Sequence, residues 1–367
     1  WRAWDNVRWS DDIGGAWVRN RIVKVLKGVK INHADETQVK IKRAYLGATK
    51  ISHVEQRLRD MLFSTSADFD SDHTLINFRN GTLDVVKNEF GIHNVEDLLT
   101  NIVDFDYDPD IPPGAWARWL RRTLPNPLDR KAIQRIMGYG VFTWGNPERV
   151  IVWLTGGTST GKSTLVEAIG TVMGEHFARS FDLNIFKNSQ NGAATPALQA
   201  VMKKRLIWTA ETAKESRLHA DVIKRLVGND TINYRALYAD EASAKPAFLP
   251  VIATNVIPEI DGADAALRRR WVALNFTNKI DDESADVALA ERLPRENAPE
   301  IFNWLLDGYR QYRRFKLFKA IKHLAPVSDA YFQQTNIYSR FLDTCTVQSE
   351  NTRVSSQEAY TRFIEYT

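Results

Sequence analysis

The sequence predicts an α/β protein built around a phosphate-loop (P-loop) core, with helical regions on either side. Two observations predict this class. Residues 156–164 fit the pattern G-x-x-x-x-G-K-[ST] at every position, and they directly follow the apolar run 150–155, as in a strand–loop–helix unit. Beyond the loop, apolar strand patterns and helical patterns alternate as far as residue 276, which is typical of an α/β core.

Composition indicates a globular chain and excludes several classes of protein. Of its 367 residues, 44% are apolar, which is enough for two or three domains with real cores. Apolar runs reach only about six residues, far short of the roughly twenty that span a bilayer, and no signal-peptide pattern opens the chain. The single cysteine, Cys345, excludes a disulfide framework, so we expect a cytoplasmic protein of the host cell cytosol with no membrane partner.

The ends of the chain and its charge give two further expectations. The chain begins at Trp1 without Met and ends inside a helical pattern, so we expect a fragment of a longer polypeptide. Its 49 basic and 45 acidic residues give a net charge of +4, which by itself indicates a mixed, solvated surface. The basic residues gather in patches that a polyanion would meet, at 19–30, 40–43, 203–205, 268–270 and 310–322.

Before the core, residues 1–145 are expected to be mainly helical. Apolar residues at 17–25 and at 54–62 recur at helical spacing, and so do those at 116–124 and 132–139. Between these helices, Asn80-Gly81 joins two short strand patterns and predicts a hairpin.

The core is expected to occupy residues 146–280 and to be followed by two further segments. Its predicted strands are 150–155, 205–210, 248–254 and 271–276. Residues 281–325 are predicted to form a helical subdomain, because apolar residues from Ile301 to Tyr312 recur at helical spacing. Pro326 then marks the start of a truncated segment, 326–367, one interpretation of which is the beginning of a winged-helix DNA reader.

The phosphate loop supplies the candidate nucleotide ligands. Its glycines let backbone N–H groups turn toward phosphates, Lys162 reaches the β- and γ-phosphates, and the Ser163 hydroxyl is placed to bind Mg²⁺. The sequence therefore predicts ATP and Mg²⁺ as cofactors, and the alternative is a glycine-rich turn without a ligand. The predicted cofactor-binding residues are Gly156, Gly157, Thr158, Ser159, Thr160, Gly161, Lys162, Ser163 and Thr164.

Three later positions are candidates for catalysis. Glu211 follows the strand 205–210 and is placed to activate water or complete the Mg²⁺ shell; the alternative is a helix N-terminal charge. Asn255 follows the next strand and is placed to sense the γ-phosphate or, alternatively, to cap a turn. The cluster Arg268-Arg269-Arg270 is a natural source of an arginine finger, or else a basic surface strip.

The order of phosphate loop, lone Glu, Asn and Arg pair within about 115 residues resembles the superfamily 3 helicases of phages, plasmids and large DNA viruses, a branch of the AAA+ ATPases. The block 223–230 followed by Arg235 is similar to the family's lysine, glycine and aspartate block, although Val227 and Asn229 stand where Thr and Gly are expected. Upstream, 80–84, 98–100 and 107–109 resemble the linker or oligomerisation domain that precedes the ATPase in primase-helicases.

This resemblance implies an AAA+-like P-loop ATPase that forms a homo-hexameric ring, closes its ATP sites between subunits and threads single-stranded DNA. It assigns the finger to Arg269, with Arg270 as second choice, and it implies fusion to, or work with, a primase-polymerase domain. It also implies a DNA-contacting hairpin within 232–246. Its candidate DNA ligands are Arg235, Tyr238 and Lys245, with the alternative that Arg235 pairs with Asp240.

The function expected from these features is an ATP-dependent DNA helicase in phage, plasmid or viral replication, acting on single-stranded and forked duplex DNA. The alternative is an ATP-switched origin-binding or loader protein that does not unwind processively. A small-molecule P-loop kinase is disfavoured, because a kinase has no need of Asn255 and the arginine cluster in this order.

Overall fold

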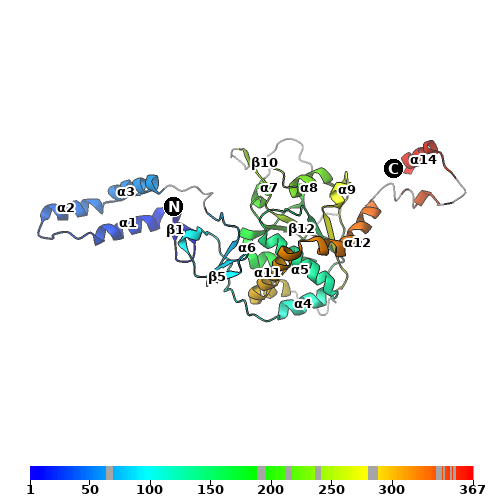
Figure 1. Cartoon of the computed structure of the whole chain (residues 1–367). Helices are drawn as coiled ribbons and strands as arrows, with labels where there is room; N and C mark the ends of the chain where they lie inside the picture. Colours follow the sequence, from blue (N-terminus) through cyan, green and yellow to red (C-terminus); the bar gives the residue numbers. More distant parts are fainter. Residues whose placement is uncertain are drawn as a thin grey trace. The chain divides into compact units, whose positions relative to one another are not determined.

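The computed structural model describes residues 1–62, 69–187, 196–210, 217–235, 241–279, 288–335, 341, 344–347, 349 and 353–366. The chain divides into two compact units, Trp1–Tyr107 and Asp108–Thr367 (Figure 1). This division differs from the boundary expected at residue 145, because helices α4 (Ala115–Thr123) and α5 (Pro127–Phe142), which lie before that residue, pack within the second unit. In the described part of the chain, no helix has the length and apolarity needed to cross a bilayer.

The N-terminal unit contains both of its predicted features, helices and a hairpin. The hairpin strands β3 and β4 pair Phe78 with Gly81, so the two-residue turn is Arg79-Asn80, one position earlier than predicted. A first hairpin, β1–β2, was not predicted. The elements of the unit are β1 (Arg2–Trp4), β2 (Trp9–Asp11), α1 (Ala16–Gly28), α2 (Glu36–Tyr45), α3 (Ala48–Met61), β3 (Leu75–Phe78), β4 (Gly81–Asp84) and β5 (Glu89–Gly91).

Helix α1 forms where the spacing predicted it, but its buried side differs from the side that the spacing picked out. Trp17 and Val25 are 50% and 61% exposed, whereas Val18 and Ile22 are buried. Helix α1 contacts α3 and α2. Residues one position apart on a helix point in directions about 100° apart, so Val18 and Ile22 are buried while Trp17, one position before Val18, is exposed. The aromatic residue that started the predicted stripe is therefore a surface residue.

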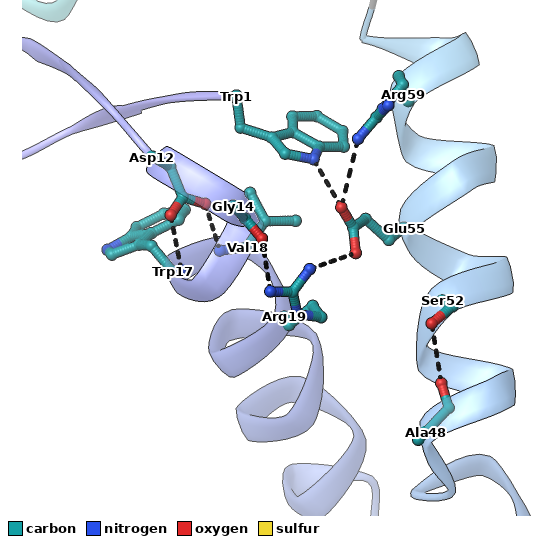
Figure 2. Close-up of polar contacts among 10 residues, drawn as sticks. All are labelled: Trp1, Asp12, Gly14, Trp17, Val18, Arg19, Ala48, Ser52, Glu55 and Arg59. Atoms are coloured by element: carbon teal, nitrogen blue, oxygen red, sulfur yellow. Dashed lines mark hydrogen bonds and ion pairs between the residues drawn. The ribbon is translucent and has the colours of Figure 1, made fainter.

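A buried carboxylate joins the start of the chain to α1 and α3 (Figure 2). Glu55 of α3 is about nine-tenths buried. It accepts hydrogen bonds from the Trp1 indole N–H at 3.0 Å and from Arg19 Nη1 at 3.2 Å, and Arg59 Nη2 lies 3.4 Å from its Oε1. The Trp1 hydrogen bond, followed by the hydrogen bond and charge of Arg19 and the charge of Arg59, holds the pKa of Glu55 below its ordinary 4.5, against the opposing effect of burial.

The second unit is built on a five-stranded parallel sheet, ordered β14-β6-β12-β8-β7. All four predicted core strands are present within a residue or two of their expected limits, and β7 was missed. The α/β class and the P-loop type of core are therefore confirmed. The strands of this unit are β6 (Ile151–Gly156), β7 (Ala178–Ser180), β8 (Leu206–Thr209), β9 (Leu218–His219), β10 (Ile232–Arg235), β11 (Glu241–Ala244), β12 (Leu249–Ala253), β13 (Ile260–Asp261) and β14 (Trp271–Phe276).

Helices cover both faces of this sheet. Successive side chains of a strand point to opposite faces, so Ile207 joins one buried cluster while Leu206 and Trp208 contact α5 and α6 on the other side. The helices of this unit are α4 (Ala115–Thr123), α5 (Pro127–Phe142), α6 (Lys162–Phe177), α7 (Pro196–Val201), α8 (Ala220–Val227), α9 (Ala265–Arg268), α10 (Leu289–Glu296), α11 (Ala298–Phe315), α12 (Phe318–Thr335) and α14 (Ser356–Tyr366).

Helix α12 continues past the expected break at residue 326. Pro326 lies inside it, and the Ser328 hydroxyl accepts a hydrogen bond from the backbone N–H of Ala273 in β14 at 3.1 Å. Farther along, Tyr331 stacks on Trp271, with ring centroids 4.8 Å apart. Packing on the sheet thus holds a helix that the proline alone would be expected to end.

Glu55→Gln keeps the size of the side chain but removes the charge that Arg19 and Arg59 share. At about pH 7 we expect it to lower the free energy of unfolding of the N-terminal unit by about 1–2 kcal/mol. Because the folded pKa of Glu55 is lowered, the contribution of its charge is present above the unfolded pKa and is lost as the pH falls through the folded pKa. The difference between wild type and variant should therefore narrow as the pH falls below the ordinary carboxyl pKa of 4.5 and through the lowered pKa of folded Glu55.

Urea denaturation followed by circular dichroism, at neutral and at acidic pH, measures this difference. Glu36→Gln is the matched control, because Glu36 is exposed and its pair with Lys40 is 3.9 Å long. A Glu55→Gln defect of equal size at both pH values would show that lost packing, and not lost charge, is responsible.

Candidate nucleotide-binding site

The phosphate loop joins the end of β6 to the start of α6. Its backbone has positive φ at Gly156 (136°), Ser159 (57°) and Gly161 (88°), and Gly161 is the N-cap of α6. Right-handed and left-handed residues that alternate in a loop are the arrangement in which backbone N–H groups can surround an anion, and the first turn of α6 adds unpaired N–H groups. A loop of this kind at the positive end of a helix suits an anion.

Lys162 brings the charge of the site. It is 6% exposed, and its Nζ donates to the carbonyl oxygens of Gly156 (2.9 Å) and Gly157 (2.5 Å), with Thr160 Oγ1 at 3.1 Å. Burial lowers the pKa of Lys162. Among the described residues no carboxylate pairs with this ammonium group, so its partners are neutral oxygens. A buried cation with neutral partners at the mouth of a donor-rich loop fits a bound phosphate.

Helix α4 supports the loop from behind, which sequence patterns did not reveal. A Cβ atom on Gly161 would lie 2.7 Å from Thr123 Cγ2 and 3.2 Å from Trp119 Cζ2. Helix α4 is in turn bonded to Asn278, whose Nδ2 donates to the carbonyl oxygen of Arg122, the residue before Thr123, at 2.5 Å. The apolar stripe of α4 did predict a buried face. It did not predict that this face would meet the phosphate loop.

Asn255 lies at the same edge of the sheet as the loop. Ala253 of β12 is level with Leu154 of β6, and Thr254 N donates to Leu154 O at 2.9 Å. Continuing this register by two residues places the exposed Asn255 level with Gly156. Strand β8 ends at this edge too, beside β12. Glu211 comes two residues after the end of β8, but it lies outside the described residues, so its role stays a prediction.

The arginine cluster lies at the opposite edge. Arg270 immediately precedes β14, and its carbonyl oxygen accepts a hydrogen bond from Ile151 N at 2.8 Å, at the first residue of β6. Ile151 and Gly156 are five residues apart in a strand, about 16 Å. The arginines and the phosphate loop of one chain are therefore separated by the length of β6.

The three arginines differ in their surroundings. Arg268 pairs with Asp329 of α12 at 2.6 Å, and Arg270 Nη1 donates to the Ala266 carbonyl oxygen at 2.9 Å. Arg269 is exposed and forms no ion pair with any residue that the structure describes. Of the three, Arg269 is the exposed arginine without an ion-pair partner among the described residues, and its role as the finger stays a prediction.

The hairpin expected within 232–246 is present as β10–β11, with Arg235 paired in register to Glu241. Lys245 follows β11 and is exposed. Tyr238 and Asp240, and the side chain of Arg235, lie outside the described part of the chain. No group of three or more His, Cys, Asp or Glu side chains that could hold a metal occurs in the ranges described. Ser163, the predicted Mg²⁺ ligand, is half-buried beside Lys162, and its role stays a prediction.

Two families match separate parts of the chain. Residues 1–125 match the family described as "D5 N terminal like", and residues 154–270 match a family of unknown function (DUF5906). The second range begins in β6 and ends at Arg270, so it contains the phosphate loop, Glu211, Asn255 and the arginine cluster.

The relatives are viral proteins. The chain is 22% identical to a protein of Acanthamoeba polyphaga mimivirus named as a helicase, over 100% of this chain and 43% of that protein. It is 24% identical to primase D5 of fowlpox virus, over 61% of this chain and 30% of that protein. A frog virus 3 protein named as a helicase is also 24% identical, over 62% of this chain and 25% of that protein. The chain spans less than half the length of these relatives.

Two solved structures are similar at low scores. The C-terminal region of NrS-1 has a TM-score of 0.43 and 14% identity, covering 68% of this chain and 64% of that one. The JCV helicase has a TM-score of 0.34 and 15% identity, covering 68% and 62%.

Two single substitutions test whether this loop holds a nucleotide. Lys162→Ala removes the buried ammonium, and Gly161→Ala places a methyl group against Thr123 at a φ of 88°, so we expect each to weaken ATP binding by about tenfold or more. Titration with a fluorescent ATP analogue measures the loss, and circular dichroism checks the fold. Gly91→Ala is the control, because no atom lies within 4 Å of its added Cβ and Gly91 belongs to β5 in the N-terminal unit, not to the loop. If a folded Lys162→Ala variant still bound the ATP analogue tightly, the phosphate loop would not be the nucleotide-binding site.

Proposed function

We propose that this chain, a relative of the superfamily 3 primase-helicases, is the ATP-driven motor of a viral or phage replication helicase whose ATP sites are shared between neighbouring copies. The resemblance first drawn from the motif order is confirmed by the match of residues 1–125 and by the viral relatives named as helicases and primases. The chain therefore falls among replication helicases and primases. The cofactors, the ring and the DNA substrates are the further content of the proposal.

The observation that carries the proposal is the separation of the two cationic groups. A transferred γ-phosphoryl group needs positive charge on more than one side as its own charge redistributes. Lys162 supplies one cation at the carboxyl edge of the sheet, whereas Arg269 lies exposed at the amino edge, about 16 Å away along β6. Arg269 can serve only a phosphate loop on another copy, so a ring in which each copy completes its neighbour's site uses both groups.

Within such a site each residue has a distinct task. The N–H groups of the loop and Lys162 bind the β- and γ-phosphates of ATP, and Ser163 ligates Mg²⁺, which neutralises charge between these phosphates. Glu211 orients the attacking water or completes the Mg²⁺ shell, and Asn255, level with Gly156, hydrogen-bonds the γ-phosphate or the water. Arg269 of the neighbouring copy stabilises the charge that develops on the transferred group.

Hydrolysis is coupled to DNA through the β10–β11 hairpin in this proposal. The hairpin follows α8 and precedes β12, so its second strand leads through residues 245–248 into β12, and Asn255 comes two residues after β12 ends. Arg235 and Lys245 offer cations for the phosphate backbone, and Tyr238 offers an aromatic ring for a base. A hexameric ring that draws single-stranded DNA past these hairpins, and so separates a forked duplex, follows from the family resemblance. The second candidate, an ATP-switched origin binder or loader, differs in changing its DNA affinity without displacing a strand.

Mixing two inactive variants tests the shared site. Arg269→Ala and Glu211→Gln should each reduce ATP hydrolysis by about 10³-fold, because each removes one catalytic part from every site. Mixed in equal amounts, they should recover about a quarter of the wild-type rate, since random neighbours place an intact Glu211 opposite an intact Arg269 at about one site in four.

Arg268→Ala is the matched control for the arginine. It removes the same charge one residue away, but from a side chain already paired with Asp329, so its rate should stay within about twofold of wild type. If no mixing ratio restores hydrolysis while both variants assemble normally, each site belongs to one chain and the shared-site proposal fails.

A further inference from the structure

The positive charge of this chain is concentrated in one short segment. Residues 16–62, which form α1, α2 and α3 and are called here the helical arm, contain eleven Lys and Arg residues and four Asp and Glu residues, a net charge of +7. The whole chain has a net charge of +4, so the remainder carries a net charge of −3. The arm is therefore a strongly cationic element attached to a weakly acidic protein.

Four of the eleven cations in the arm have structural partners. Arg19 and Arg59 pair with the buried Glu55, as Figure 2 shows, and Lys40 pairs with Glu36. Lys42 Nζ donates to the carbonyl oxygens of Lys27 and Val29 at 2.8 and 2.7 Å, at the end of α1. The Arg19 pair joins α1 to α3 and the Lys42 bonds join α2 to the end of α1, whereas the Lys40 and Arg59 pairs each lie within one helix.

The remaining seven cations are exposed. None of them forms an ion pair with any residue that the structure describes. Seven exposed positive charges repel one another, and a bound polyanion relieves this repulsion. Each cation that neutralises a phosphate also releases a counterion, which favours binding. The seven residues are Arg21, Lys24, Lys27, Lys30, Arg43, Lys50 and Arg57.

The outer side of α1 adds an aromatic ring to this charge. Trp17, Arg21, Lys24 and Lys27 follow one another at spacings of four, three and three residues, so they line one side of the helix. The buried residues Val18 and Ile22 lie on the other side, and the Trp17 ring points away from α3 in Figure 2. The row is about 15 Å long.

We infer that the helical arm is a second DNA-binding site, in which the outer side of α1 binds single-stranded DNA separately from the β10–β11 hairpin. Arg21, Lys24 and Lys27 contact consecutive phosphates, and the half-exposed Trp17 indole stacks on a base. A single strand is favoured over a duplex because an indole on a helix surface can stack only on a base whose face is open.

Nucleotide-free binding of the full chain to a fluorescein-labelled oligothymidylate, followed by anisotropy across a salt series, tests the inference. The variant Arg21→Ala/Lys24→Ala/Lys27→Ala should bind about tenfold or more weakly, and the slope of log K against log salt should fall by about 2, since each phosphate contact on a single strand contributes about 0.7. Trp17→Ala should lose about fivefold or more in affinity with an unchanged salt slope.

Matched controls separate the arm from general charge and from general aromatic exposure. Arg292→Ala/Arg295→Ala/Arg310→Ala removes three cations from α10 and α11 that each have an acidic partner, and Trp144→Ala removes an indole that is 42% exposed in the second unit. Both should bind the oligonucleotide like wild type. Thermal melts check that the arm variants remain folded.

Three outcomes would overturn the inference: an arm triple variant with wild-type affinity and salt slope, equal losses in the control triple variant, or a triple variant that changes only self-association or binding to anionic vesicles. The measurement needs no nucleotide. Failure of ATP hydrolysis would therefore leave this result standing, and failure of the arm would leave the proposed ATP site standing.

Discussion

The parallel hydrogen bonding of β6 to β12 and β14 determines at which edge of the sheet the phosphate loop, Asn255 and the arginine cluster lie. Parallel strands end at the same edge of the sheet, so the phosphate loop after β6 and Asn255 after β12 are level with each other. The same rule places residues that precede a strand at the other edge, where Arg268, Arg269 and Arg270 lead into β14 beside the first residue of β6. One hydrogen-bonding pattern thus places the phosphate loop and the arginine cluster at opposite edges of the sheet, and the proposal of an ATP site shared between copies depends on this separation.

Burial separates the residues that support the site from those that act in it. Lys162 is buried against neutral oxygens and Gly161 is packed on α4, so the loop is held in place from behind. Arg269 and Asn255 are exposed, which is compatible with the contacts to a neighbouring copy and to ATP that are proposed for them. In the N-terminal unit the buried Glu55 pairs with Arg19 and Arg59, while seven other cations of the helical arm are exposed and have no ion-pair partner among the described residues.

Patterns in the sequence were sufficient to predict those elements that a single short segment of the chain forms. The four core strands and the phosphate loop were predictable because a continuous apolar run before a G-x-x-x-x-G-K-[ST] loop has few other ways to fold. The β10–β11 hairpin was expected from the family resemblance. Contacts between distant segments were not predictable. The spacing of Trp17 indicated a helix but not which side α3 would cover, and Pro326 predicted a break in α12 that packing against β14 prevents. The support of Gly161 by Thr123 joins residues almost forty positions apart and leaves no periodic signal in the sequence.

The central claim is that ATP is hydrolysed between copies and that the strand being moved promotes it. The most direct measurement is the rate of ATP hydrolysis per copy across a series of protein concentrations, with and without single-stranded DNA. The account predicts a rate that rises with concentration to a plateau, as copies associate, and a higher plateau with DNA. A rate per copy that is flat over the series and indifferent to DNA would contradict it, because a site complete within one chain would need neither a neighbour nor a strand.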